Sequence, residues 1–298
     1  MSRREREWVD WIRARAGSLP GLLRGIGDDA AVLEVGNRGP IVLACDQCLE
    51  SVHFEPGVDP WELVGRKALA RVLSDMAAMA ARPWAALVSV SVPEGDDALL
   101  EALMGGLLEA AAREQTAVVG GDMARSPRGV SLDVTVLGLL EGREAWGRDG
   151  ARPGDELWVS GELGGTRAGH HLRFVPRWRE ALALHATGAV NSAIDLSDGL
   201  AQDLPRLCEA SGVGAVLRLS DLPRRTDSEG RRCSIEAALG DGEDFELLLA
   251  VAPGRGPELQ AACEVKLTRI GEIQLEGLDA VSADGVVQPL RRGGYEHF

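Results

Sequence analysis

Carboxylate residues recur along this 298-residue chain beside glycines or at the ends of apolar runs. The first pair, Asp28-Asp29, follows Gly25-Ile26-Gly27 and precedes an apolar run that starts at Ala30. Others of the same kind are Asp46, Ser74-Asp75, Gly120-Gly121-Asp122, Asp195-Leu196-Ser197-Asp198-Gly199 and Gly240-Asp241-Gly242-Glu243-Asp244. Carboxylates at strand and helix ends, next to backbone that bends freely, are what a centre with several Mg²⁺ ions needs. The pattern predicts a magnesium-dependent enzyme that acts on phosphates.

Asp75 is the most informative of these acids because it lies inside an apolar helical stretch, between Leu73 and Met76. An ion pair with Arg71, one helical turn earlier, is the ordinary explanation, but such a pair is worth only roughly 0.2–0.5 kcal/mol. That is a weak reason to keep a carboxylate in the most apolar helix of the chain. A role as metal ligand explains Asp75 at least as well. The other acids keep ordinary alternatives, as helix caps, Asx turns or solvated loop charges.

Several residues could bind phosphate beside these acids. Asp122 follows two glycines, so backbone amides and a carboxylate can converge on one phosphate–metal unit. Arg125 and Arg148 are candidate phosphate contacts because a guanidinium matches phosphate geometry, although isolated arginines are usually solvated. The sequence contains neither a Walker A motif nor a dinucleotide fingerprint. A nucleotide would therefore bind through Mg²⁺, carboxylates and backbone amides.

Composition excludes several classes of protein. The net charge is −14, with 45% hydrophobic and 26% charged residues, so the chain is globular and a poor general binder of nucleic acid. Its five cysteines are scattered and odd in number, which argues against a disulfide framework. Met1 to Asp10 has no apolar signal core, and the longest uncharged apolar run, Pro83 to Pro93, is short of the roughly 20 residues that span a bilayer. We expect a cytoplasmic protein with no membrane partner.

Periodicity and turn residues predict the elements that position these acids. We expect helices at residues 5–16, 61–81, 96–114, 200–211 and 257–265, and strands at 42–46, 85–92, 117–119, 131–140, 157–160, 193–196, 215–219 and 245–251. Residues 166–190 are expected to be helical in part. Strands and helices alternate, but hairpin-length connections also occur, which favours a mixed α/β or α+β fold. Gly, Pro and charged residues gather around 148–155, so we expect two domains, 1–147 and 148–298.

Taken in order, the same segments resemble the thiamine-monophosphate kinases, a family of the PurM-like (aminoimidazole-ribonucleotide-synthetase-like) superfamily. The resemblance runs nearly end to end. Its motifs are Gly25 to Leu33, Asp46 with Val52-His53-Phe54, Lys67 to Ala70 with Leu73 to Met79, Gly120-Gly121-Asp122 with Arg125-Ser126, Arg148 with Gly150 to Asp155, Ile194 to Leu200, Gly242 to Leu247, and Gly294 to Phe298. Each motif is modest alone, and all of them in this order are highly specific.

The resemblance implies a PurM-like two-domain fold, with an N-terminal mixed sheet that forms a dimer interface and a C-terminal α/β domain. It implies transfer of the γ-phosphoryl group of ATP to thiamine monophosphate, with several Mg²⁺ ions and a homodimer. The family's magnesium ligands correspond here to Asp29, Asp46, Asp75, Asp122, Asp195 and Asp198. Its ATP contacts correspond to Gly121, Asp122, Arg148 and Ser197, and its substrate contacts to His53, Glu243 and Tyr295. A phosphate nucleophile is already ionised near pH 7, since its second pKa is about 6, so no general base is expected.

Four features depart from the family's usual pattern. Cys45-Asp46-Gln47 stands where Thr-Asp-Thr is usual, so a hydroxyl ligand is lost there. Met123-Ala124 replaces two threonines, Asp241 replaces a glycine, and the segment 166–192 is shorter than usual. The lost hydroxyls put contacts to ATP in question. The short segment puts in question the shape of the side of the site that binds the nucleotide.

Two other functions remain open on the sequence. One is another enzyme of the superfamily, such as aminoimidazole ribonucleotide synthetase or selenophosphate synthetase; the latter typically carries a reactive Cys and a Lys in a glycine-rich N-terminal loop, and residues 17–27 contain neither. The other is a non-catalytic relative that binds a thiamine phosphate or a nucleotide as a sensor. Retention of all six carboxylates argues against the sensor.

Overall fold

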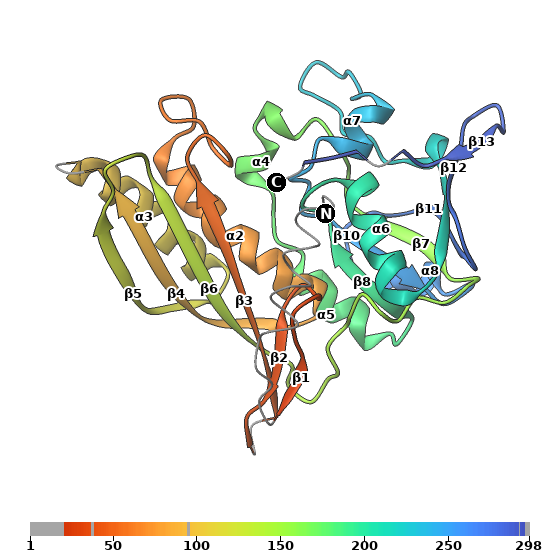
Figure 1. The fold of residues 1–298 in the computed structure, drawn as a ribbon, viewed down its shortest axis with the longest axis horizontal. Helices are drawn as coiled ribbons and strands as arrows, with labels where there is room; N and C mark the ends of the chain where they lie inside the picture. Colours follow the sequence, from red (N-terminus) through yellow and green to blue (C-terminus); the bar gives the residue numbers. More distant parts are fainter. Residues whose placement is uncertain (1–20, 37–38, 94–95, 292, 296–298) are drawn as a thin grey trace.

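In a computed structural model, the described residues are 21–36, 39–93, 96–291 and 293–295. They form two domains, each built on one mixed β-sheet, with helix α2 (Trp61–Ala78) between them (Figure 1). The fold is therefore mixed α/β, as predicted. The helix expected at 5–16 lies outside the described residues. Among the helices that are described, none is long and apolar enough to cross a membrane.

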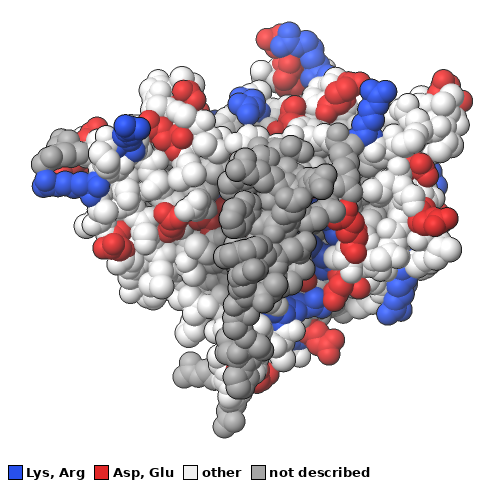
Figure 2. All heavy atoms as spheres, viewed as in Figure 1, with Lys and Arg blue, Asp and Glu red and all other residues white. Residues whose placement is uncertain are grey.

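The first sheet has six strands in the order β1-β2-β3-β6-β4-β5, and within it only β4 and β5 run parallel. The strands are β1 (Leu22–Arg24), β2 (Ala31–Glu34), β3 (Pro40–Leu49), β4 (Arg82–Val92), β5 (Ala117–Arg125) and β6 (Ser131–Leu139). Buried residues alternate along β6, because one face of the sheet packs against α2 and α3 (Asp97–Arg113). Among the described residues no helix covers the opposite face, and the part of it visible in Figure 2 carries few charged side chains (Figures 1 and 2).

Helices α2 and α3 cross in backbone contact. A Cβ atom added to Gly65 would lie 1.8 Å from the carbonyl oxygen of Leu103, and one added to Gly106 would lie 1.9 Å from that of Glu62. Only glycine lets two helices approach so closely at these positions. The crossing fixes α2 against the first sheet while its other side faces the second domain.

The second sheet has seven strands in the order β13-β12-β9-β11-β7-β10-β8, in which only β12 and β9 run parallel. The strands are β7 (Glu156–Ser160), β8 (Val190–Asp195), β9 (Gly214–Arg218), β10 (Leu247–Val251), β11 (Leu267–Gln274), β12 (Leu278–Val281) and β13 (Val287–Pro289). The helices of this domain include α6 (Leu200–Ser211), α7 (Ile235–Gly240) and α8 (Gly256–Ala262). Leu200, Leu204 and Leu207 bury one side of α6 in the core of the sheet.

The segment expected to be partly helical carries η2 (Thr166–Ala168), α4 (His170–Arg173) and α5 (Trp178–Ala186), and it packs on α2. The guanidinium of Arg66 donates a hydrogen bond of 2.9 Å to the carbonyl oxygen of Leu172. Behind α3, the buried Glu114 accepts hydrogen bonds from Trp178 Nε1 at 2.9 Å and from Arg179 Nη1 at 2.5 Å. These contacts hold the two domains in a fixed relation around α2.

Most predicted elements are confirmed with ends shifted by a few residues, but two predictions were wrong. The strand expected to end at Val119 continues to Arg125, so Gly120-Gly121-Asp122 lies inside β5 rather than after a strand. The strand expected from Phe245 begins at Leu247. Glu243 and Phe245 have positive φ angles of 56° and 50°, a left-handed backbone that cannot belong to a strand.

Candidate active site

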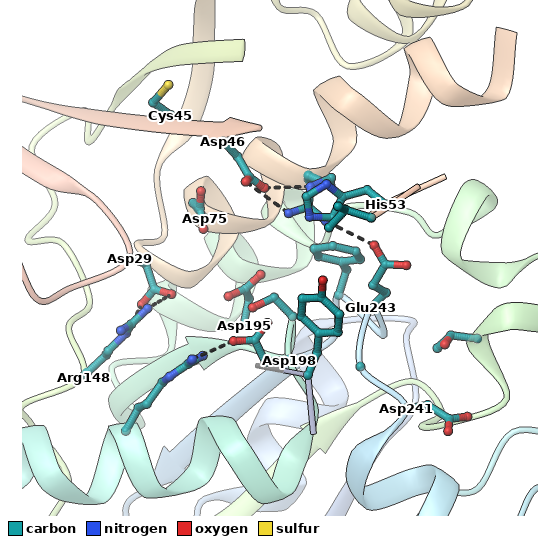
Figure 3. A pocket seen from close by; sticks show the side chains of 18 of the residues that line it. Asp29, Cys45, Asp46, His53, Asp75, Arg148, Asp195, Asp198, Asp241 and Glu243 are labelled. Atoms are coloured by element: carbon teal, nitrogen blue, oxygen red, sulfur yellow. Dashed lines mark hydrogen bonds and ion pairs between the residues drawn. The ribbon is translucent and has the colours of Figure 1, made fainter. Parts of the chain in front are cut away.

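A cavity of about 390 Å³ lies between the two domains (Figure 3). The first domain lines it from the turn between β1 and β2, from β3 and from α2, and the second from the end of β8, from α6 and from residues 241–245. Ten of the twelve predicted site residues line this cavity: Asp29, Asp46, His53, Asp75, Arg148, Asp195, Ser197, Asp198, Glu243 and Tyr295.

Three carboxylates form the acidic end of the cavity. Asp29, Asp75 and Asp195 each offer one oxygen atom, and these atoms all lie within 4.8 Å of one another. Burial raises the pKa of Asp75 and Asp195 well above the usual range, and neighbouring carboxylates raise it further. Ser74 Oγ donates a hydrogen bond of 2.6 Å to Asp195, yet no Lys or Arg within the described ranges forms an ion pair with Asp75 or Asp195. The end therefore offers clustered carboxylate oxygens suited to a hard cation.

Three arginines of the cavity form ion pairs with acids, one of which, Asp29, also belongs to the acidic end. The pairs are Asp29–Arg148, Asp46–Arg71 and Asp198–Arg206. Arg148 contacts both oxygens of Asp29, at 2.8 and 2.7 Å, and Arg71 contacts both oxygens of Asp46, at 2.9 and 3.1 Å (Figure 3). Burial lowers the pKa of Arg71, but the neighbouring groups, Asp46 first and Glu243 among the others, together outweigh it, so the net pKa is raised. The ordinary explanation of Asp75 as the ion-pair partner of Arg71 is therefore wrong.

The other end of the cavity is organised by a buried lysine of α2. The Nζ atom of Lys67, whose side chain is 0% exposed, lies 2.7 Å from Glu243 Oε1 and also donates to the carbonyl oxygen of His53. Burial lowers the pKa of Lys67, and Glu243 offsets part of this effect. The backbone N–H of Leu49 donates to His53 Nδ1 at 2.9 Å, which fixes the ring. One lysine thus holds both His53 and Glu243.

Aromatic rings complete this end, which we call the ring end of the cavity: His53, Glu243, Phe245 and Tyr295. The ring of Phe245 stacks on that of Phe174 with centroids 4.0 Å apart. The backbone N–H of Tyr295 donates to the carbonyl oxygen of Asp198 at 3.1 Å, which holds Tyr295 beside Asp198 in the lining of the cavity. An aromatic cation would be recognised here by rings and by the carboxylate of Glu243.

A glycine turn of the second domain closes one side of the cavity. Gly164 N–H donates to Asp244 Oδ1 and Gly165 N–H to Asp241 Oδ2, both at 2.8 Å. The turn brings Thr166 to the lining of the cavity. Asp241, which departs from the family pattern, thus anchors this turn and lines the cavity as well.

Gly121 and Asp122 are the two predicted site residues that the structure does not bring to the cavity. Asp122 pairs in register with the exposed Ser89, whereas Asp46 shares a row across the sheet with the buried Val88, so the two acids project from opposite faces. The strand order also leaves three strand spacings, about 14 Å, between β3 and β5 (Figure 1). Within one chain, Asp122 and Gly121 cannot join the acidic end.

Comparisons with known proteins show what the chain is similar to. The models of the AIR synthase related protein match residues 27–140 (N-terminal domain) and 155–283 (C-terminal domain). A thiamine-monophosphate kinase of Rhodopirellula baltica is 39% identical over 90% of this chain and 89% of that protein. The chain belongs to the thiamine-monophosphate kinase family. The structure of AaThiL complexed with AMPPCP and TMP has a TM-score of 0.84 and 29% identity over 100% of this chain and 99% of that one. The structure of the thiamine-monophosphate kinase of Stenotrophomonas maltophilia K279a has a TM-score of 0.72 and 32% sequence identity, over 91% of this chain and 94% of that one.

In this member of the thiamine-monophosphate kinase family, the sequence motifs predicted many of the residues that line the cavity but not all of them. Arg71, Arg206 and Phe245 line the cavity and were not predicted as site residues. Arg206 had a signal, because it follows Asp198 by eight residues, about two helical turns along α6. Arg125, a predicted phosphate contact, lies on β5 with Asp122 and does not line the cavity.

Proposed function

We propose that this protein transfers the γ-phosphoryl group of ATP to thiamine monophosphate, giving thiamine diphosphate and ADP, inside the cavity between its domains. The observation that carries the proposal is the joining, in one cavity, of a carboxylate cluster and an aromatic, acidic ring end. ATP–metal chemistry belongs at the first and a cationic ring at the second. Relatives at 29–39% identity carry the name thiamine-monophosphate kinase, and AaThiL was complexed with AMPPCP and TMP.

The residues at the acidic end fit Mg²⁺. Asp195 is buried and Asp75 is half-buried, burial and neighbouring carboxylates raise the pKa of both, and neither has an ion-pair partner among the described residues. A buried cluster of this kind is costly unless a metal ion compensates it. We assign Asp29, Asp46, Asp75, Asp195 and Asp198 as the residues that would hold magnesium. When bound, Mg²⁺ supplies charge neutralisation between two polyanions.

The remaining work falls to side chains that bind and orient. Arg148 and Ser197 lie beside the acidic end and are assigned to the phosphates of ATP. His53, Glu243 and Tyr295 are assigned to thiamine monophosphate, with Glu243 and the Tyr295 ring facing its cationic ring. The attacking phosphate oxygen is ionised at about pH 7, so the protein needs to align it and exclude water rather than remove a proton.

We also propose a homodimer that joins the open faces of two first sheets. Trp84 and Leu87 of β4 are each 43% exposed, although both are large and apolar. That face carries few charges (Figure 2), and an exposed apolar face of a sheet is a usual protein interface. Asp122 projects from this same face, as its pairing with Ser89 requires. In a dimer, Gly121 and Asp122 could act at the partner's cavity, which they cannot reach in their own chain.

Mixing two inactive variants tests this arrangement. Asp75→Asn removes an acid from its own cavity, and Asp122→Asn removes one that we assign to the partner's cavity. Refolding the two together should yield mixed dimers with one intact site, and so about a quarter of wild-type activity. Full activity of Asp122→Asn alone, or no recovery on mixing, would contradict the role of Asp122 across a dimer.

The activity itself is tested by ADP release from Mg-ATP. We expect release that requires both thiamine monophosphate and Mg²⁺, with thiamine diphosphate formed in equal amount. Calorimetry with thiamine monophosphate and a non-hydrolysable ATP analogue accompanies the assay. Binding of both ligands without turnover would refute the kinase and favour a sensor.

A further inference from the structure

Arg71 stands at the boundary between the acidic end and the ring end. Its Nε and Nη2 atoms contact Asp46 at 2.9 and 3.1 Å, and its Nη1 atom contacts Glu243 at 3.2 Å. Figure 3 shows Asp46 on the side of the acidic cluster and Glu243 across the cavity from it. Resting on the proposed function, we propose that Arg71 binds the phosphate group of the acceptor substrate and so selects a phosphorylated acceptor.

The position follows from the reaction. The acceptor's cationic ring belongs among His53, Glu243 and Tyr295, and the ATP phosphates belong at the acidic end. The acceptor's phosphate must lie between the two, since its oxygen has to meet the γ-phosphorus in line. Arg71 lines the cavity at this junction, although it is only 8% exposed.

The guanidinium of Arg71 has two donor atoms on one edge that can bind a phosphate. Nε and Nη2 form the two-donor edge that matches a phosphate; in this structure Nη2 donates to Asp46 Oδ1, whereas Nε lies 2.9 Å from Oδ2 but has no hydrogen-bond partner. A cation held by Asp46 would compete for those same oxygens and leave the edge for a phosphate. Glu243 on Nη1, and the ring of Phe245 at 5.5 Å from the guanidinium carbon, would keep Arg71 in position. Such a side chain is preorganised, because it need not be drawn in from solvent.

Lys67 supplies the matched control. It contacts the same carboxylate, Glu243 Oε1, but it is fully buried and does not line the cavity. If Arg71 only serves to position Glu243, Arg71→Met and Lys67→Met should have the same effect on ligands. If Arg71 binds the phosphate, only Arg71→Met should discriminate between phosphorylated and unphosphorylated ligands.

Calorimetry on the full chain, with Mg²⁺ present, measures the affinities for thiamine monophosphate, thiamine and a non-hydrolysable ATP analogue. We expect Arg71→Met to lower the affinity for thiamine monophosphate about 10- to 100-fold, the usual loss for a charged hydrogen-bonded pair. The affinities for thiamine and for the ATP analogue should change less than about threefold, which is the range for loss of an exposed ion pair. Lys67→Met should leave the ratio of the two thiamine affinities unchanged. Arg71→Lys keeps the charge but loses the two-donor edge, and it should show a smaller loss of the same selectivity.

Equal losses for thiamine and thiamine monophosphate in Arg71→Met would overturn the inference and make Arg71 a structural counter-ion. A loss confined to the ATP analogue would also overturn it. If Arg71→Met does not fold, Arg71→Lys decides alone, and unchanged selectivity there counts against the inference. Wild-type protein that binds neither thiamine ligand would instead refute the proposed function, and the inference with it.

Discussion

Replacing Asp75 by Asn should stabilise the metal-free protein while it destroys activity. The oxygens of Asp75, Asp29 and Asp195 lie within 4.8 Å of one another. Two unit charges at that distance repel by about 3 kcal/mol at an effective dielectric constant of ~20, before the cost of burial is added. Proton uptake relieves part of this cost in the wild type. We therefore expect Asp75→Asn to raise the free energy of unfolding by about 2 kcal/mol, a Tm increase of roughly 5 °C.

The same substitution should remove the response to magnesium. A neutral amide is a poorer ligand for Mg²⁺ than a carboxylate, so the Tm of Asp75→Asn should no longer rise when Mg²⁺ replaces EDTA. Turnover should fall by at least about 100-fold, because a bound metal is expected to stabilise the transition state by several kcal/mol. Loss of activity together with a gain in stability distinguishes a lost ligand from a damaged fold.

Thermal unfolding in EDTA and in Mg²⁺, beside ADP release, measures both effects. Asp97→Asn is the matched control, since Asp97 lies exposed in the first turn of α3 and away from the cavity. It should change neither the stability nor the activity beyond experimental scatter. A lower Tm of Asp75→Asn in EDTA, or Mg²⁺-dependent turnover close to that of the wild type, would refute the charge-cluster argument.

Three other substitutions test the surroundings of the site. Burial raises the pKa of Asp244 from 3.8 to about 8. The native protein therefore keeps a proton that the unfolded chain releases above about pH 4, so wild-type stability should fall as pH rises to about 8. Asp244→Asn should show a smaller decline, because Asp75 and Asp195, whose pKa is also raised, keep their own contributions; urea unfolding at about pH 5 and pH 8 measures the difference. Gly65→Ala would set a methyl group against the Leu103 carbonyl oxygen, and we expect a loss of roughly 2–4 kcal/mol in the same unfolding assay. Glu114→Ala leaves the buried Trp178 N–H without its acceptor and should cost about 2 kcal/mol, seen as a lower Tm; an unchanged Tm would mean that the contact between α3 and α5 is dispensable.

The sequence predicts the acidic end well because its residues carry a local signal. A carboxylate inside the apolar run of α2 is unusual enough to single out Asp75 without any tertiary information. Asp195 ends β8 and Asp198 follows it, and strand ends of this kind often carry site residues. Most strands of the two sheets were likewise predictable from alternating apolar residues and turn residues, which depend on neighbours along the chain.

What the sequence does not predict is the direction of a side chain rather than the type of residue. Asp122 was predicted from a motif, but its face is decided by the register between β4 and β5, where one residue separates opposite sides of the sheet. Arg71 lies four residues before Asp75, so the sequence suggests a helical ion pair, yet the guanidinium turns to Asp46 and Glu243. Partners brought together by the domain arrangement leave no periodic trace in the sequence.

The charge pattern of the cavity indicates where a first cation should bind. Asp29, Asp46 and Asp198 each have an arginine partner, so a cation at any of them must displace a guanidinium or share its carboxylate. Asp75 and Asp195 contribute negative charge with no ion pair among the described residues to offset it. A cation bound to that pair therefore removes the largest free-energy cost, which comes from the burial of the carboxylates and the repulsion between them. Because Asp75 belongs to α2 of the first domain and Asp195 to β8 of the second, the same cation would also tie the two domains together across the cavity.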